Sequence, residues 1–181
     1  RFGSYQNQVE QYAKKLNLKN LEFTSGPMSS EKYDEFLESL DCMVFVSKGE
    51  GYSITPREML ALGKPVILSN NTAHRTICKT GFVKQIESNI KQPAKYEIFQ
   101  NQQIGYYFDC EKKNIIDAMR EIYYDYPAAL DQAKPGREWV KSALWNNLKP
   151  LYKTLVKPKR VMLTKSNYVS DEMLGTTSQN L

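Results

Sequence analysis

The stretch Cys42 to Ser69, CMVFVSKGEGYSITPREMLALGKPVILS, decides the fold that we predict. Its short apolar run breaks at a carboxylate between two glycines, and the helix pattern that follows opens on Thr-Pro and ends at Gly63. A second apolar run begins after Pro65. The stretch therefore predicts a strand, a tight turn, a helix and a second strand. Because ligands bind beyond the carboxyl ends of strands in an open parallel sheet, we expect the functional site at the loop 47–54.

Helix and strand patterns alternate on both sides of this stretch. Apolar residues recur at helical spacing over residues 5–16, and Leu21–Thr24 has the composition of a short strand. A further helix is predicted over residues 111–124, and one or two more over residues 128–152. Pro150 should kink or end the last of these helices. We therefore predict an α/β fold with a Rossmann-like parallel sheet and helices on both of its faces.

The formal charge of +5 is spread unevenly over the chain. Residues 1–152 indicate one domain, and residues 153–181 a basic and then polar tail that holds most of the excess charge. The rest of the chain is nearly neutral, which argues against a nucleic-acid partner. The basic residues of 153–165 could contact anionic lipid, and a solvated tail explains them equally well. Without a spanning apolar run or a signal peptide, we expect a cytoplasmic protein, at most peripheral at the inner face of a membrane.

Three cysteines and one histidine limit the metal and redox chemistry. Cys42, Cys78 and Cys110 lie far apart and lack metal-ligand spacing, which favours reduced thiols and no metal site. His74 and Cys78 stand four residues apart, a spacing that would allow a dyad on one helix face. Ordinary side chains explain the pair better than a catalytic dyad does.

The turn after the first apolar run has the features of a ligand site. Gly49 and Gly51 flank Glu50, so a ligand can approach the carboxylate closely from either side. Glu50 has no helix end to cap, which favours a role in ligand binding. Thr55 and Pro56 suit the start of a helix, whose unpaired amides would face the crevice and suit a phosphate.

Glu58 has two interpretations that spacing alone does not separate. It could close a capping box with Thr55, or it could accept hydrogen bonds from a vicinal diol such as a ribose. Arg57, beside it, could serve a phosphate, but pairing with a neighbouring acid is the simpler expectation.

These residues resemble a known family. The sequence Glu50-Gly51-Tyr52-Ser53-Ile54-Thr55-Pro56-Arg57-Glu58, with Met59 to Ile67 after it, resembles the E-x7-E signature of retaining nucleotide-sugar glycosyltransferases of the GT-B fold. In family 4 of that class the usual form is EGFG-x-x-x-x-E followed by A-x-A-x-G-x-P-V-I. The similarity extends over most of residues 1–152, through the segments Leu18–Gly26, Asp41–Ser47, Gly105–Asp125 and Trp145–Tyr152. It implies one half of a GT-B fold, the carboxyl-terminal half that binds the donor.

The resemblance implies a role for each matching residue. Glu50 would be catalytic, contacting the donor sugar and helping to hold its oxocarbenium-like centre, and Glu58 would bind the ribose hydroxyls. The remaining donor contacts would come from Gly51 and the amides of Tyr52, Ser53 and Ile54 at the diphosphate, and from Gly26, Pro27 and Met28 beside the base.

The implied reaction moves a sugar, such as a hexosyl group, from a nucleotide-diphosphate sugar to a glycan or lipid-linked acceptor, with retention of configuration. Such reactions serve polysaccharide or glycoconjugate biosynthesis. The resemblance implies no metal and no cofactor, because helix amides and side chains stabilise the leaving diphosphate. The acceptor site would lie mainly in a preceding domain, and an Arg and a Lys that help to hold the diphosphate would lie upstream of Arg1. Because the chain begins at Arg1 without a methionine, we expect a part of a longer enzyme, one that binds the donor without turnover.

Two features depart from the family pattern. Thr72, Ala73 and Thr76 stand where the family often has a Gly-Gly pair and a Glu, which weakens the expectation of donor-sugar contacts there. Residues 79–103 resemble an insertion, either an ordered excursion near the crevice mouth or a plain surface loop. The alternative function is therefore a non-catalytic nucleotide-sugar-binding module on the same scaffold. A sugar-nucleotide epimerase is a weaker rival, because this half lacks clear acid and base groups.

Overall fold

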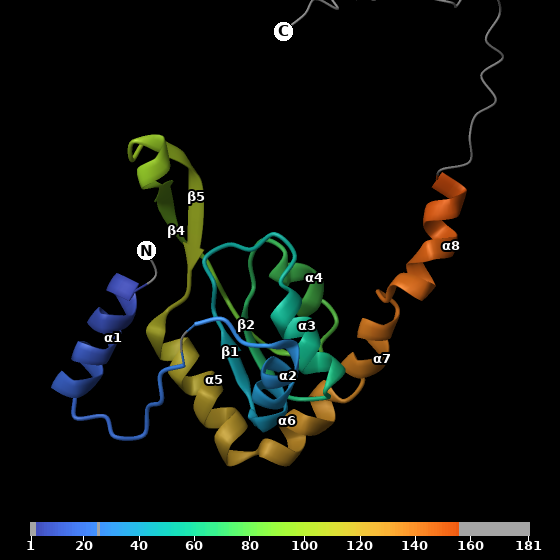
Figure 1. Cartoon of the computed structure of the whole chain (residues 1–181), viewed down its shortest axis with the longest axis horizontal. Coiled ribbons are helices and arrows are strands. Elements are labelled where there is room, and N and C mark those ends of the chain that lie inside the picture. The colour runs from blue at the N-terminus through green and yellow to red at the C-terminus, as the bar shows by residue number, and fades with distance from the viewer. Residues whose placement is uncertain (1–2, 25, 156–181) are drawn as a thin grey trace, which may run out of the picture.

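A parallel sheet of three strands lies at the centre of the protein (Figure 1). The computed structural model describes residues 3–24 and 26–155. The sheet order is β1-β2-β3, and both neighbouring pairs are parallel, with Met43 opposite Val66 and Ile67 opposite Lys84. Its strands and the helices that connect them are β1 (Met43–Phe45), α3 (Ile54–Ala61), β2 (Val66–Ser69), α4 (His74–Cys78) and β3 (Lys84–Ile86).

The central strand β2 is buried along its whole length and divides two cores. Its side chains alternate between the faces of the sheet, so that Val66 and Leu68 join one core and Ile67 joins the other. Helices α2 (Ser30–Ser39), α3 and α4 supply buried residues to the first core, and α5 (Lys112–Tyr124) supplies them to the second. The predicted α/β class, with a parallel sheet and helices on both faces, is therefore confirmed.

An antiparallel hairpin extends away from the sheet in Figure 1. It comprises β4 (Ile90–Lys95), a 3-10 turn (Glu97–Phe99) and β5 (Gln103–Asp109). The segment 79–103, which we expected to be an insertion, also contains β3, which pairs with β2. The separate unit is therefore the hairpin, and it begins at Ile90 rather than at residue 79.

Helices flank the body at both ends of the described chain: α1 (Gly3–Lys15) before it, and α6 (Tyr126–Ala133), α7 (Gly136–Lys141) and α8 (Trp145–Leu155) after it. The predicted strand Leu21–Thr24 is wrong, because these residues pair with no strand in the described structure and are exposed. Pro150 does not end α8, which continues to Leu155. The predicted tail covers residues 153–181. Its first three residues belong to α8, and the rest lies outside the described residues. No helix in the described ranges is long and apolar enough to cross a membrane.

Close packing between α3 and α7 fixes the position of α3. Gly136, the first residue of α7, is buried against the fully buried Leu60 of α3. Arg137 donates hydrogen bonds to the carbonyl oxygens of Ala61 and Leu62, at 3.0 and 2.9 Å, where α3 ends. These bonds satisfy two carbonyl groups that a helix end leaves unpaired.

We expect Gly136→Ala to lower the free energy of unfolding by about 1–3 kcal/mol, because overpacking a filled site forces its neighbours to shift. A Cβ at this position would lie 2.8 Å from Cδ2 and 3.2 Å from Cβ of Leu60. Urea unfolding of the chain measures the change. Gly105→Ala is the matched control, because no atom lies within 4 Å of its added Cβ. Equal stability of the two variants would contradict the close contact between α3 and α7.

Candidate functional site

The turn after β1 holds Glu50 at the carboxyl edge of the sheet. The Glu50 amide donates a hydrogen bond to Oγ1 of Thr72 at 2.8 Å, and the Glu50 carbonyl oxygen accepts one from the Ala73 amide at 3.3 Å. Within the described part of the chain, the Glu50 carboxylate has no hydrogen bond or ion pair. The backbone of Glu50 is therefore fixed while its charged group stays free. Thr72, which departs from the family pattern, contributes to this positioning.

A buried amide side chain, that of Asn71, holds this turn in place from the interior of the protein. Asn71 is completely buried, and its Nδ2 donates to the Ser47 carbonyl oxygen and to Oγ of Ser88, both at 2.9 Å. Ser69 Oγ donates to the same Ser47 carbonyl oxygen at 2.6 Å. Thr72 Oγ1 donates to Oδ1 of Asn71 at 2.9 Å, which joins this network to Glu50. The ends of β1 and β2 and the segment after β3 are thus connected through hydrogen-bonded polar groups.

Helix α3 begins differently from the sequence-based prediction. Ser53 precedes it with a φ of 61°, in the left-handed region, and forms no side-chain cap. Thr55 lies inside the helix rather than at its cap, so the prediction that Thr55 caps this helix is wrong, and the capping-box interpretation of Glu58 falls with it. Oε2 of Glu58 instead accepts a hydrogen bond from the Tyr33 hydroxyl at 2.8 Å. Burial, together with the Glu58 carboxylate, raises the pKa of Tyr33.

Glu58 also lines a small pocket between α2 and α3. The pocket has a volume of about 310 Å³, and the carboxylates of Asp34 and Glu38 share its lining with Glu58. Carboxylates accept hydrogen bonds, so the chemistry of this pocket suits a ligand with hydroxyl groups and disfavours an anion. The loop Gly26-Pro27-Met28 is exposed and leads into α2, which carries Tyr33. This loop and Glu58 therefore border the same helix.

Three buried polar atoms near the start of α3 have no hydrogen-bond partner among the described residues. They are Oγ of Ser53, Nε of Arg57 and Nε2 of His74. Buried polar atoms are rarely left unpaired in folded proteins, so such a group of atoms indicates a ligand, an ordered water or a further part of the protein. Tyr52 and Ser53 add two backbone amides that donate no hydrogen bond within the described structure.

Arg57 is nine-tenths buried between two aromatic rings. Its Cζ lies 4.3 Å from the ring centroid of Tyr52 and 5.0 Å from that of Trp139. No acidic group in the described ranges forms an ion pair with Arg57, so the prediction that it pairs with a neighbouring acid is wrong. Stacking on the aromatic rings stabilises its charge without neutralising it.

His74 is completely buried and stays neutral at pH 7. Burial lowers its pKa, and the charge of Arg57 lowers the pKa further, against the opposing influence of the Ser69 hydrogen bond and the Glu50 charge. Nδ1 of His74 lies 3.1 Å from the Ser69 carbonyl oxygen. Because a carbonyl oxygen can only accept, Nδ1 carries the proton and Nε2 presents a lone pair.

The cysteines show no sign of activation. All three are free, and burial raises the pKa of Cys42 and of Cys78 to about 11. Cys78 is therefore protonated at pH 7, and Nδ1 of His74 is engaged by Ser69, which argues against a His74–Cys78 dyad. No cluster of three or more His, Cys, Asp or Glu side chains in the described ranges is arranged to hold a metal ion.

The structure thus divides the predicted site into two parts. Glu50 to Ile54 form one turn beside the 70–74 segment, whereas Glu58 faces α2, four residues beyond that turn. Sequence reasoning missed the contributions of Asn71 and Tyr33. The run of Ser and Asn after β2 was a usable signal for Asn71, because polar residues at the carboxyl end of a buried strand lie at the ligand edge.

We expect the stability that His74 contributes to decrease at acidic pH. The unfolded chain takes up a proton near the usual histidine pKa of about 6.5, and the folded chain does so only at lower pH. The contribution is therefore fully present above pH 6.5, approximately, and is lost as the pH falls below it. Urea unfolding of the native chain and His74→Gln from about pH 7.5 to about pH 5.5 tests this. Parallel pH profiles of the two proteins would contradict it.

Comparison with known proteins places the chain in a family. The family model described as "Glycosyl transferases group 1" matches residues 2–139. No curated protein sequence matches the chain. The solved structure of sucrose-phosphate synthase from Thermosynechococcus elongatus is similar in fold, with a TM-score of 0.60 and 19% sequence identity. The alignment covers 84% of this chain and 34% of that one, so this chain spans about a third of the enzyme's length. Because the family model covers most of its residues, the chain belongs to the group 1 glycosyl transferases.

Proposed function

We propose that this chain is the donor-binding half of a retaining glycosyltransferase that uses a nucleotide-diphosphate sugar. The observation that carries the proposal is the free carboxylate of Glu50, held on a fixed backbone at the carboxyl edge of the sheet. Family membership supports glycosyl transfer, and the E-x7-E spacing of Glu50 and Glu58 supports the retaining class.

The donor would span the two parts of the site. Glu58 would accept hydrogen bonds from the ribose hydroxyls in the acidic pocket between α2 and α3, with Gly26, Pro27 and Met28 beside the base. The amides of Tyr52, Ser53 and Ile54, together with Gly51, would hold the diphosphate at the start of α3, where the helix dipole favours an anion.

The chemistry requires stabilisation of two opposite charges. As the bond between the anomeric carbon and the diphosphate oxygen breaks, negative charge grows on the diphosphate and positive charge on the sugar ring. The unpaired charge of Arg57 and the helix amides would stabilise the first, and Glu50 the second. The acceptor hydroxyl would then bond to the anomeric carbon on the same face and give up its proton to the departing diphosphate. This assignment includes no metal or other cofactor.

The acceptor, a glycan or a lipid-linked sugar, would be bound by a preceding domain, and the chain alone would not complete the transfer. We place the enzyme in the cytoplasm, where the basic residues of 153–165 would either contact anionic lipid at the inner face of a membrane or remain solvated. A non-catalytic nucleotide-sugar-binding module remains the second candidate. The residues Thr72, Ala73 and Thr76 favour it, because they stand where the family pattern often has a Gly-Gly pair and a Glu.

The role of Glu58 is tested by calorimetry with UDP, GDP, ADP and CMP. We expect one nucleotide to bind preferentially, and Glu58→Gln to weaken it by about 1.5–3 kcal/mol, the range for a hydrogen bond to a charged group. Tyr33→Phe is the matched control, because it removes the bond to Glu58 but keeps the carboxylate. Glu38→Gln controls for the charge of the pocket. Unchanged affinity in Glu58→Gln would return Glu58 to a structural role.

The role of Glu50 predicts a different pattern. We expect Glu50→Gln to leave the affinity for the bare nucleotide unchanged and to weaken the nucleotide-sugar by at least about tenfold, since only the sugar contacts the carboxylate. Titrating the variant with the nucleotide and then with its sugar conjugates measures both affinities. Equal loss for the nucleotide and the conjugate would place Glu50 at the phosphates instead of the sugar.

A further inference from the structure

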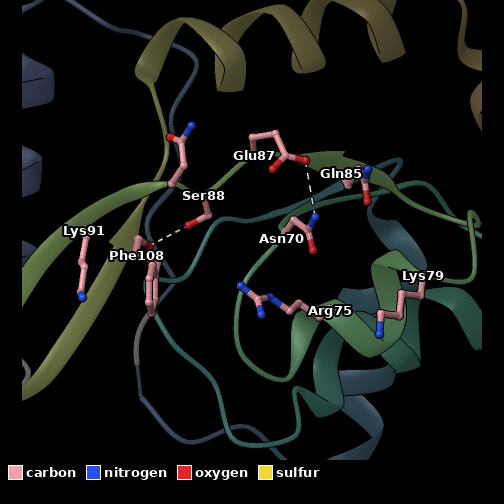
Figure 2. Close-up of a pocket in the computed structure, with 9 residues that line it drawn as sticks. Asn70, Arg75, Lys79, Gln85, Glu87, Ser88, Lys91 and Phe108 are labelled. Carbon is pink, nitrogen blue, oxygen red and sulfur yellow. Dashed lines mark hydrogen bonds between the residues drawn. The ribbon is translucent and has the colours of Figure 1, made fainter.

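A second pocket, of about 470 Å³, opens where β2 and β3 end (Figure 2). It lies between α4 and the base of the β4–β5 hairpin. Figure 2 shows Arg75 extending from α4 toward Phe108, with Lys79 directly after the end of the same helix and Lys91 on the hairpin. Asparagine, glutamine and serine side chains make up most of the remaining lining.

The pocket carries an uncompensated positive charge. Arg75, Lys79 and Lys91 line it, and none of them forms an ion pair with another described residue. Lys91 lies over the ring of Tyr106, at 3.7 Å from its centroid. Glu87 is the single carboxylate in the lining, and the amide of Asn70 approaches it at 3.4 Å. Three cations against one carboxylate favour an anionic ligand.

The floor of this pocket is fixed by buried contacts. Ser88 is almost completely buried, its Oγ donates to the Phe108 carbonyl oxygen at 2.8 Å, and it accepts from Asn71 at 2.9 Å. These bonds tie the hairpin base to the segment after β3. A ligand would therefore meet a preformed surface, which reduces the entropy lost on binding.

The pocket is distinct from the Glu50 turn. Thr72 and Ala73 face that turn and hydrogen-bond to the Glu50 backbone. Asn70 and Arg75, which bracket them in the sequence, line the pocket instead. A ligand held here would thus lie beside the Glu50 turn without displacing a nucleotide at Glu58.

We propose that this pocket binds the phosphate group of a small hydroxylated molecule, such as a phosphorylated sugar. Arg75 would bind the phosphate through two parallel hydrogen bonds, and Lys79 and Lys91 on either side of it would add positive potential. The amide side chains of Asn70 and Gln85 would bind hydroxyl groups, and the Phe108 ring would pack against the carbon skeleton. The ligand could be a soluble sugar phosphate or the phosphate-linked head of a lipid. The proposal stands whether or not Glu58 binds a nucleotide.

The test is calorimetric titration of the chain with glucose 6-phosphate, with glucose as the uncharged comparison. We expect glucose 6-phosphate to bind saturably and glucose not to bind. Added salt should weaken the binding of glucose 6-phosphate, because exposed charges are screened. Arg75→Gln and Lys79→Gln should each reduce the affinity by at least about tenfold. Arg120→Gln is the matched control, an exposed arginine on α5 that lines a different pocket. Glu58→Gln should leave this binding unchanged.

A second measurement separates the two sources of phosphate. Sedimentation with phosphatidic acid vesicles, compared with phosphatidylcholine vesicles, reports binding to a lipid head, again for the native chain, Arg75→Gln and Arg120→Gln. Binding of either probe that depends on Arg75 supports the proposed phosphate site. The probe that binds shows whether the phosphate belongs to a soluble sugar or to a lipid head. The proposal is overturned if neither probe binds, or if binding persists in Arg75→Gln and Lys79→Gln. Thermal unfolding of each variant checks that it remains folded.

Discussion

The buried side chain of Asn71 is the contact on which the ligand-binding edge depends. A three-stranded parallel sheet leaves its strand ends as separate loops, and Asn71 joins them by donating to the Ser47 carbonyl oxygen and to Ser88. Burying the Asn71 amide without these partners would cost about 1–3 kcal/mol, so the arrangement is strongly preferred over looser ones. Through Thr72, the same network reaches Glu50. The position of Glu50 is thus set by the hydrogen bonds of the buried Asn71, on the interior side of the turn.

Because this network lies between two open surfaces, it positions both. On one side are the Glu50 turn and the start of α3, and on the other is the basic pocket, whose floor includes Ser88. The chemistry of the two surfaces differs: one presents a free carboxylate beside unpaired amides, and the other presents Arg75 with two lysines. Rigid support shared by two such surfaces would let two polar ligands occupy fixed relative positions, as a reaction between them requires.

Local pattern was sufficient for the fold and for part of the site. The apolar run Val66–Ser69 predicted a buried strand, and the glycines around Glu50 predicted an accessible turn, because both depend on neighbouring residues. The prediction of a strand at Leu21–Thr24 was wrong, since a strand forms only where the edge of another strand is available to pair with it. The partner of Glu58 was also missed, because Tyr33 lies 25 residues away and its approach depends on how α2 packs against α3.

The position of the positive charge was beyond sequence reasoning for a similar reason. Nothing local predicts that Arg57 stacks between Tyr52 and the distant Trp139 rather than pairing with an acid. An ion pair would cancel most of its field, whereas aromatic rings stabilise a weakly hydrated guanidinium and leave its charge available. Burial keeps the adjacent His74 neutral, so it does not add a second positive charge. The start of α3 therefore combines one unneutralised cation with unpaired amides, which is an electrostatic environment that favours an anionic ligand.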